Sequence, residues 1–275
     1  MILATAGALL LVIADMVVRA LRLRVLLGPV EPRRLASAVA VNALGDAASA
    51  LTPARLGGEP ARFLALRNRG APTSAAAVVL ATERVVDMGL AAVVAVVAAA
   101  LLGARGFEDV SALVARFASP SALPWMLLVA VLVIAFATAA VQFRHRFPRI
   151  GPSLREAVAH ARAMVGTRLG AAVGLTLVSM ASRVAILPVL LWGSGALRDP
   201  VAAAVGSFAL IYAQLLLPTP AGVGGVELGF VVGVAPLLPP PEVAGLLLTW
   251  RAITVGVPAG LGAILFARTR STSLR

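Results

Sequence analysis

The chain has 275 residues, of which 60% are hydrophobic and only 13% are charged, and it contains no cysteine. A soluble domain carries about a quarter charged residues, so this chain lacks the polar surface that water requires. All 24 basic residues are arginine, and the formal net charge is +12. They lie between apolar segments rather than on an aromatic-rich basic face, which argues against nucleic acid as a partner. The lack of cysteine excludes disulfides, thiolate catalysis and zinc–thiolate sites.

Apolar segments follow one another along the chain and predict an all-α polytopic membrane protein with a single membrane domain over residues 1–275. The expected segments are residues 1–18, 35–53, 73–102, 122–143, 169–193, 201–217, 221–237 and 243–267. The first segment has no basic region before it and no cleavage site after it, so we expect a retained helix rather than a removed signal peptide. By length and charge, the sequence predicts about five full spans and two re-entrant hairpins.

Arginine placement predicts the orientation in an inner (cytoplasmic) membrane. Residues 19–34, 144–168 and the tail 268–275 are rich in arginine, so the positive-inside rule places them in the cytoplasm. Residues 103–120 are balanced in charge, which places them outside. We therefore expect the N-terminus outside and the C-terminus in the cytoplasm. Residues 103–168 are expected to supply a linking helix and a basic cytoplasmic segment, with residues 150–168 forming an amphipathic helix on the membrane surface.

Two stretches do not fit a simple alternation of spans. Residues 35–53 have arginine-rich flanks on both sides, so we expect a re-entrant hairpin that turns near Pro53. Residues 201–217 and 221–237 are separated only by the Pro-Gly-rich turn at 218–225, and their outer flanks are poor in charge. This pattern predicts a second hairpin that enters from the opposite face.

The two turns are similar in sequence and indicate an internal repeat. Residues 52–59 read TPARLGGE and residues 219–227 read TPAGVGGVE. Arg84 follows Pro53 at the same offset at which Arg251 follows Pro220. We expect one repeat over residues 1–102 and a second over residues 169–267. The charge map orients the two repeats oppositely, and inverted repeats of this kind place transporter sites near the bilayer midplane.

Three ordered motifs resemble the flippase-like membrane domain of lysylphosphatidylglycerol synthases. The first comprises Asn42, Pro53, Arg55, Gly57, Gly58, Glu59 and Arg62, the second Glu83, Arg84 and Asp87, and the third Pro218, Pro220, Gly222, Gly224 and Glu227. The resemblance covers nearly the whole chain. It implies a bilayer-embedded lipid translocator with re-entrant hairpins. The soluble aminoacyl-transferase domain of some members is not found in these residues, so we expect no lysyl transfer and no enzymatic activity.

Charged groups within the apolar segments are the candidate substrate-binding residues, because an unpaired charge at membrane depth is costly. Arginine forms bidentate contacts with phosphate and stays charged when it is desolvated. The arginines that we expect to bind a lipid phosphate are Arg55, Arg62, Arg84, Arg183 and Arg251. The acids that we expect to balance them, bind a cationic headgroup or carry a proton are Glu59, Glu83, Asp87 and Glu227. Polar groups in the hairpins are Asn42, Asp46 and Gln214.

Other interpretations stay open at this point. The charged groups can instead pair with one another and fix helix packing. Asp15 and Arg19 are interpreted as an interfacial pair near a helix end, and His145 and His160 as surface residues. Without cysteine or clustered histidines, we expect no metal and no cofactor.

The leading functional hypothesis is a flippase or scramblase for an anionic or aminoacylated phospholipid, or for a polyprenyl-phosphate lipid. The alternatives are a headgroup-modifying enzyme with Glu59 or Glu227 as base, and a non-catalytic partner of a separately encoded transferase or glycosyltransferase. A homo-oligomer is also open.

Overall fold

The computed structural model describes residues 1–28, 34–104, 150–215, 217 and 219–273. The expected span 122–143, the outer segment 105–120, His145 and Pro218 lie outside the described residues. The chain forms two compact units, one of Met1–Asp87 with Met164–Arg275 and one of Met88–Ala163. All named elements in the described residues are helices.

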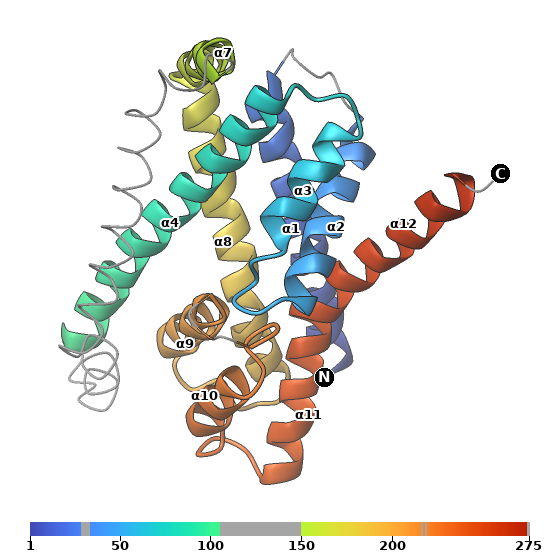
Figure 1. The fold of residues 1–275 in the computed structure, drawn as a ribbon. Coiled ribbons are helices and arrows are strands. Elements are labelled where there is room, and N and C mark those ends of the chain that lie inside the picture. Colours follow the sequence, from blue (N-terminus) through green and yellow to red (C-terminus); the bar gives the residue numbers. More distant parts are fainter. Residues whose placement is uncertain (29–33, 105–149, 216, 218, 274–275) are drawn as a thin grey trace. The chain divides into compact units, whose positions relative to one another are not determined.

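Two long apolar helices form the centre of the first unit. Helix α1 (Ile2–Leu27) and helix α8 (Thr167–Gly193) lie side by side and antiparallel (Figure 1). Their ends fix this direction, because the amino group of Met1 donates to the Gly193 carbonyl at 3.2 Å. At the other end, Gly28 adopts φ 58° directly after α1 and lies against the Arg168 side chain of α8.

The first hairpin pairs helix α2 (Leu35–Leu51) with helix α3 (Gly58–Arg67). Small residues allow the two backbones to approach closely. A Cβ atom on Gly45 would lie 3.2 Å from the Gly58 carbonyl oxygen, and a Cβ atom on Gly58 would collide with Ser49. Helix α4 (Thr73–Ala104) follows, and its first part, up to Asp87, belongs to the first unit.

The second hairpin pairs helix α9 (Pro200–Ala213) with helix α10 (Gly225–Val234). The Asp199 carboxylate caps α9, where it accepts hydrogen bonds from the backbone N–H groups of Val201 at 2.8 Å and Ala202 at 3.2 Å. The hydrophobic core beside this hairpin includes the fully buried Phe230 and Trp250, whose ring centroids are 5.7 Å apart.

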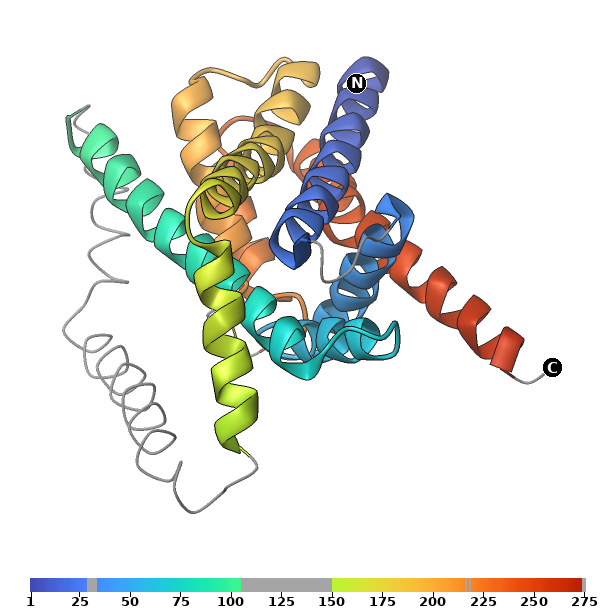
Figure 2. The ribbon, with the colours of Figure 1, turned by 90° about the horizontal axis from the view of Figure 1, so that it is seen from above.

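Three consecutive helical segments close the chain: α11 (Pro240–Arg251), the π-helical segment η3 (Ala252–Gly256) and α12 (Val257–Ser273). In η3 the Val257 N–H bonds to the Ala252 carbonyl, five residues back. Helix α12 crosses α2 (Figure 2), and a Cβ atom on Gly262 would collide with the Ala43 carbonyl. Gly262 is therefore needed for this close crossing.

Three helices in the described part of the chain are long and apolar enough to cross a membrane: Ile2–Leu27, Thr167–Gly193 and Pro240–Arg268. The chain is therefore a membrane protein. The first segment was predicted too short, because α1 continues from residue 18 to Leu27. Arg19 and Arg22 consequently belong to α1, whereas the expected first segment ended before them.

Helix α7 (Ile150–Met164) falls almost entirely in the second unit. A helix was expected over residues 150–168, and it is confirmed up to Met164, whereas Arg168 belongs to α8. Its arginines Arg155 and Arg162 are exposed, and Met164 at its end is buried. The ring of His160 lies 2.9 Å from the Glu156 carbonyl, one turn back on the same helix.

Candidate functional site

The two turns of the hairpins lie against each other. We call residues 52–57 the first turn and residues 219–224 the second turn. Pro53 and Pro220 form an isolated antiparallel β-bridge between them. The turns also share a hydrogen-bond pattern: Arg55 N–H bonds to the Thr52 carbonyl at 3.2 Å, and Gly222 N–H bonds to the Thr219 carbonyl at 3.1 Å. The sequence similarity of the turns therefore has a counterpart in their backbone conformation.

The residues after each proline adopt left-handed backbone conformations. Ala54 and Arg55 have φ of 48° and 59°, and Ala221 and Gly222 have φ of 50° and 70°. Such values suit glycine and cost other residues roughly 1–2 kcal/mol. At the position equivalent to Arg55 the second turn has Gly222, whereas the first turn holds a strained arginine. Strain of this kind concentrates at functional positions, so the strained Arg55 is a candidate functional residue.

A small pocket lies beside the first turn. Its charged residues come from α1, α2, α8 and the first turn, and its other wall includes η3 and the start of α12. The charged and amide side chains that line it are Asp15, Arg19, Asp46, Arg55, Arg183 and Gln214. Its volume is about 20 Å³, which is room for roughly one water molecule. A phosphate group therefore enters only when the surrounding segments move apart.

Arg19 is fully engaged in this pocket. Its Nε donates to Asp15 Oδ2 at 3.0 Å, and its two Nη atoms donate to the two oxygens of Asp46 at 3.0 and 2.9 Å. The remaining oxygen of Asp15 accepts from the Ser179 hydroxyl of α8. Every carboxylate oxygen of the two aspartates thus accepts a hydrogen bond, mostly from one arginine.

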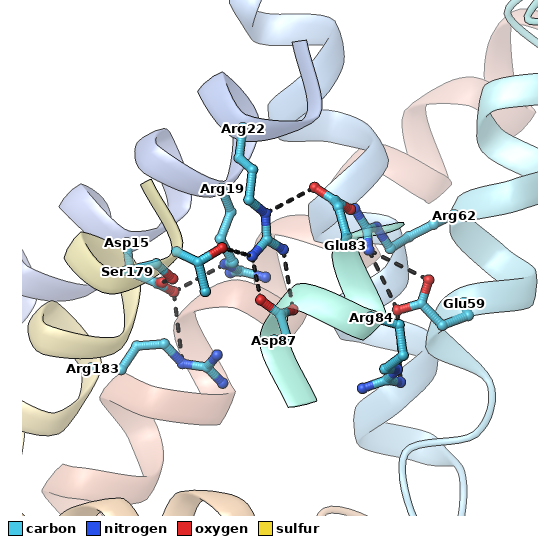
Figure 3. Close-up of polar contacts among 11 residues, drawn as sticks. Asp15, Arg19, Arg22, Glu59, Arg62, Glu83, Arg84, Asp87, Ser179 and Arg183 are labelled. Atoms are coloured by element: carbon cyan, nitrogen blue, oxygen red, sulfur yellow. Dashed lines mark hydrogen bonds and ion pairs between the residues drawn. The ribbon is translucent and has the colours of Figure 1, made fainter. Parts of the chain in front are cut away.

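The other two arginines of the pocket are held loosely. Arg55 Nη1 donates to Gln214 Oε1 at 3.1 Å, and its Nη2 lies 4.0 Å from Asp46 Oδ1. Arg183 Nε lies 4.0 Å from Asp15 Oδ2 (Figure 3), its only ion pair within the described residues. Three arginines face two aspartates, so the pocket has one positive charge in excess. Both loose guanidinium groups keep N–H donors for an anion.

A second group, which we call the Glu83 cluster, contains Arg22, Glu59, Arg62, Glu83, Arg84 and Asp87 (Figure 3). Glu83 is only 1% exposed and bridges two arginines: it accepts from Arg22 Nε at 3.0 Å and from Arg62 Nη2. The two Nη atoms of Arg22 also bond to Asp87 and to the Thr176 hydroxyl. Three arginines and three acids balance in this cluster.

The outer edge of the Glu83 cluster is weaker. Glu59 lies 3.4 Å from Arg62 Nη1 and 3.7 Å from Arg84 Nη2, and Arg84 is 43% exposed. The cluster thus has a tightly bonded, buried part at Glu83 and an open part at Glu59.

A third group belongs to the second turn alone. Arg251 Nε donates to Glu227 Oε1 at 2.8 Å, and Arg251 Nη1 donates to the Ala221 carbonyl at 2.8 Å. Glu227 Oε2 also accepts the Gly224 N–H at 2.6 Å, which caps the N-terminus of α10. Arg251 and Glu227 therefore brace the turn that carries them.

The substrate-binding residues predicted from the sequence are thus distributed over three groups rather than one. Arg55 and Arg183 line the pocket with Asp46 and Gln214; Glu59, Arg62, Glu83, Arg84 and Asp87 form most of the Glu83 cluster; Glu227 and Arg251 brace the second turn. Asn42 is buried in α2, one turn before Asp46, and its side-chain nitrogen has no hydrogen-bond partner in the described part of the chain. Pro53, Gly57, Gly58, Pro220, Gly222 and Gly224 lie in the turns or at the first residue after them.

The pairing of Asp15 with Arg19 is confirmed at 3.0 Å, but the pair does not lie near a helix end, because α1 continues to Leu27. Asp15 is 2% exposed, and both residues line the pocket. Arg22 was missed altogether. The signal was present in the sequence, since Asp15, Arg19 and Arg22 follow helical spacing and share one face of α1. Ending the first segment at residue 18 hid this face.

Comparisons with known proteins identify the family. A family described as the lysylphosphatidylglycerol synthase TM region matches residues 2–262. No curated protein matches the chain. No solved structure matches it either. The family match covers nearly all of the chain, including both turns, the pocket and the Glu83 cluster. The chain belongs to the family of lysylphosphatidylglycerol synthase transmembrane regions.

Proposed function

We propose that this protein moves a phosphate-bearing lipid, an anionic or aminoacylated phospholipid or a polyprenyl-phosphate lipid, between the leaflets of the inner membrane. The observation that supports this most is the pocket beside the first turn, where Arg55 and Arg183 keep donors free and one positive charge is in excess. An unmatched arginine in an apolar helix is costly, so a retained excess suits a ligand that supplies the anion.

Phosphate is the ligand group that fits these residues. A guanidinium group offers two parallel N–H donors to phosphate oxygens and remains charged away from water. The pocket walls contributed by Val12, Ile186 and Ile211 are apolar. In this proposal the phosphate occupies the pocket while the acyl chains stay in the bilayer, so the headgroup crosses without facing hydrocarbon.

The hairpins suggest how the two leaflets gain access. We propose that α2–α3 and α9–α10 are re-entrant, enter from opposite faces and meet at the two turns. The matching turn hydrogen bonds and the Pro53–Pro220 bridge support two inverted repeats. Because the pocket has room for only about one water molecule, transport requires the turns to separate on one side at a time. The N-terminus is then outside and the C-terminus cytoplasmic, and the protein acts as a transporter without lipid-modifying chemistry.

Reconstitution tests this proposal. The purified protein is incorporated into vesicles that carry a tail-labelled phospholipid, and transfer between leaflets is followed by quenching from outside. Wild-type protein is expected to move the lipid, and Arg55→Gln to slow this movement by at least about tenfold, since one lost charged contact is equivalent to 1.4 kcal/mol or more. Arg198→Gln is the matched control, because Arg198 is exposed and lies outside the pocket. Wild-type transfer no faster than in protein-free vesicles contradicts the proposal.

A further inference from the structure

We propose that the pocket selects lipids whose headgroup carries a single net negative charge as a phosphodiester, and disfavours lipids that add an ammonium group to that phosphate. This inference rests on the proposed transport function and narrows its substrate class. The excess charge of the pocket, the hydrogen bonds of its acids and the balance of the neighbouring cluster carry it.

The size of the excess sets the charge of the ligand. Arg19, Arg55 and Arg183 face Asp15 and Asp46, so a monoanion brings the pocket to neutrality. A zwitterionic lipid brings an ammonium group beside the same arginines, and like charges at this range in a weakly polar medium repel strongly. An aminoacylated lipid brings at least one such group, and a lysyl ester brings two.

The acids of the pocket offer no place for that ammonium group. Both oxygens of Asp46 accept from the Nη atoms of Arg19, and the two oxygens of Asp15 accept from Arg19 and Ser179. Binding of a headgroup ammonium would have to displace Arg19, which is held by three hydrogen bonds. Arg55 and Arg183, by contrast, offer donors without any rearrangement of their partners.

The Glu83 cluster supplies no spare acid either. Its three acids face three arginines, and the most buried of them, Glu83, is bonded on both oxygens. The exposed member, Glu59, lies within 3.7 Å of both Arg62 and Arg84. A cationic headgroup there would compete with two arginines for one carboxylate. Neither group of charges is therefore built to accept a cation.

Transport selectivity tests the inference. Wild-type protein is reconstituted with three lipids that have the same labelled acyl chain and differ only in headgroup: phosphatidylglycerol, phosphatidylethanolamine and lysylphosphatidylglycerol. Phosphatidylglycerol is expected to move at least about tenfold faster than the two ammonium-bearing lipids. Equal rates, or lysylphosphatidylglycerol as the fastest lipid, overturn the inference and leave the proposed transport intact. No movement of any lipid above the protein-free rate overturns both.

Two variants connect the selectivity to the pocket charge. Arg183→Gln makes the pocket neutral and is expected to abolish the preference for phosphatidylglycerol over phosphatidylethanolamine. Arg198→Gln removes the same charge outside the pocket and is expected to retain that preference. If Arg183→Gln does not fold, as judged by gel filtration in detergent, Arg55→Gln removes the same charge from the other side of the pocket. A preference that survives in a folded pocket variant contradicts the inference.

The source of the phosphodiester is tested separately. Glycerophosphoglycerol carries the same headgroup and phosphate as phosphatidylglycerol but has no acyl chains. At millimolar concentration it is expected to change the rate of lipid transfer by less than about twofold, because the acyl chains contribute most of the apolar binding energy. Complete inhibition by this soluble compound would show that the pocket takes water-soluble phosphodiesters and would overturn the assignment to a lipid.

Discussion

The first and second turns have the same backbone plan but different side chains at the decisive positions. In both, the residue two positions after the proline bonds back to the threonine carbonyl. That residue is Arg55 in the first turn and Gly222 in the second. The pairs formed by equivalent residues also differ: Glu59 and Arg84 lie 3.7 Å apart, whereas Arg251 Nε is 2.8 Å from Glu227.

The difference separates two roles. The second turn is braced by its own arginine, which bonds to Glu227 and to the Ala221 carbonyl. Arg84, which is equivalent to Arg251, is half-exposed and does not brace the first turn. Arg55 of the first turn lines the pocket instead. The second turn is thus held by its own ion pair, whereas the first turn carries a charged group that faces the proposed ligand.

The largest expected effect on stability comes from a comparison of Glu83, the most buried acid of the Glu83 cluster, with Glu227, the acid that braces the second turn. Glu83→Gln should lower the free energy of unfolding by about 3–5 kcal/mol, because it leaves Arg22 and Arg62 buried with one less charge to balance them. Glu227→Gln should cost only about 1 kcal/mol, since Glu227 is 32% exposed and water replaces part of its bonding. Unfolding in mixed detergent micelles measures both. Equal losses would remove the distinction between the two regions.

Glycine substitutions sharpen the comparison within the second turn. Gly222→Ala should cost more than about 2 kcal/mol, because the residue has φ 70° and a Cβ would lie 2.9 Å from Val226 Cγ2. Gly233→Ala in α10 is the matched variant, because Gly233 has no positive φ and no atom lies within 4 Å of the added Cβ. It should not lower the free energy of unfolding, since alanine favours a helix over glycine by about 1 kcal/mol. The same unfolding assay distinguishes them, and a larger loss at Gly233 would contradict the assigned packing.

Arg55→Gly gives the first turn the residue that the second turn has at the equivalent position, Gly222. The substitution relieves the left-handed strain and loses the hydrogen bond to Gln214, so the free energy of unfolding should change by less than about 1 kcal/mol. Lipid transfer, in contrast, should fall to near the protein-free rate. Retained stability with lost transfer separates binding from folding. A variant that transfers lipid normally would show that the strained arginine has no part in transport.

The smallest effect is expected at the loose ion pair that follows the first turn, formed by Glu59 and Arg84. Arg84→Ala should lower the free energy of unfolding by less than about 0.5 kcal/mol, because Arg84 is 43% exposed and Glu59 keeps its contact with Arg62. Thermal unfolding in detergent is precise enough to test this. A loss above about 1 kcal/mol would mean that the pair braces its turn as Arg251 braces the other.

Much of the hairpin arrangement could be predicted from charge and turn residues. The helix pairs α2–α3 and α9–α10 were expected from the turn residues near Pro53 and at 218–225, since such residues end helices. Arginine-rich flanks at the first pair and charge-poor flanks at the second predicted that both pairs are re-entrant, which stays a prediction. The offset shared by Arg84 and Arg251 indicated equivalent positions, and both arginines do lie next to the glutamate after their turn. These are local features, and local sequence encodes them.

The pairing between helices could not be predicted in the same way. Spacing shows that Asp15, Arg19 and Arg22 share a face of α1, but it does not show which neighbour that face meets. Arg19 bonds to α2 through Asp46, whereas Arg22, less than one turn further on, bonds to α4 through Glu83. The net charge of the pocket depends on this division. Only the three-dimensional arrangement separates a balanced cluster from a site with a charge in excess.

The π-helical segment at 252–256 acts as an angular offset between the two halves of the last helix. One inserted residue rotates every later side chain by about 100°, because an α-helix has 3.6 residues per turn. With this rotation Arg251 faces the second turn, and Thr254 and Pro258 line the pocket. Gly262 then packs against the Ala43 carbonyl. Deleting one residue from the segment would rotate α12 about its axis and move Gly262 away from the Ala43 carbonyl. The pocket wall that Pro258 contributes would then no longer face the arginines.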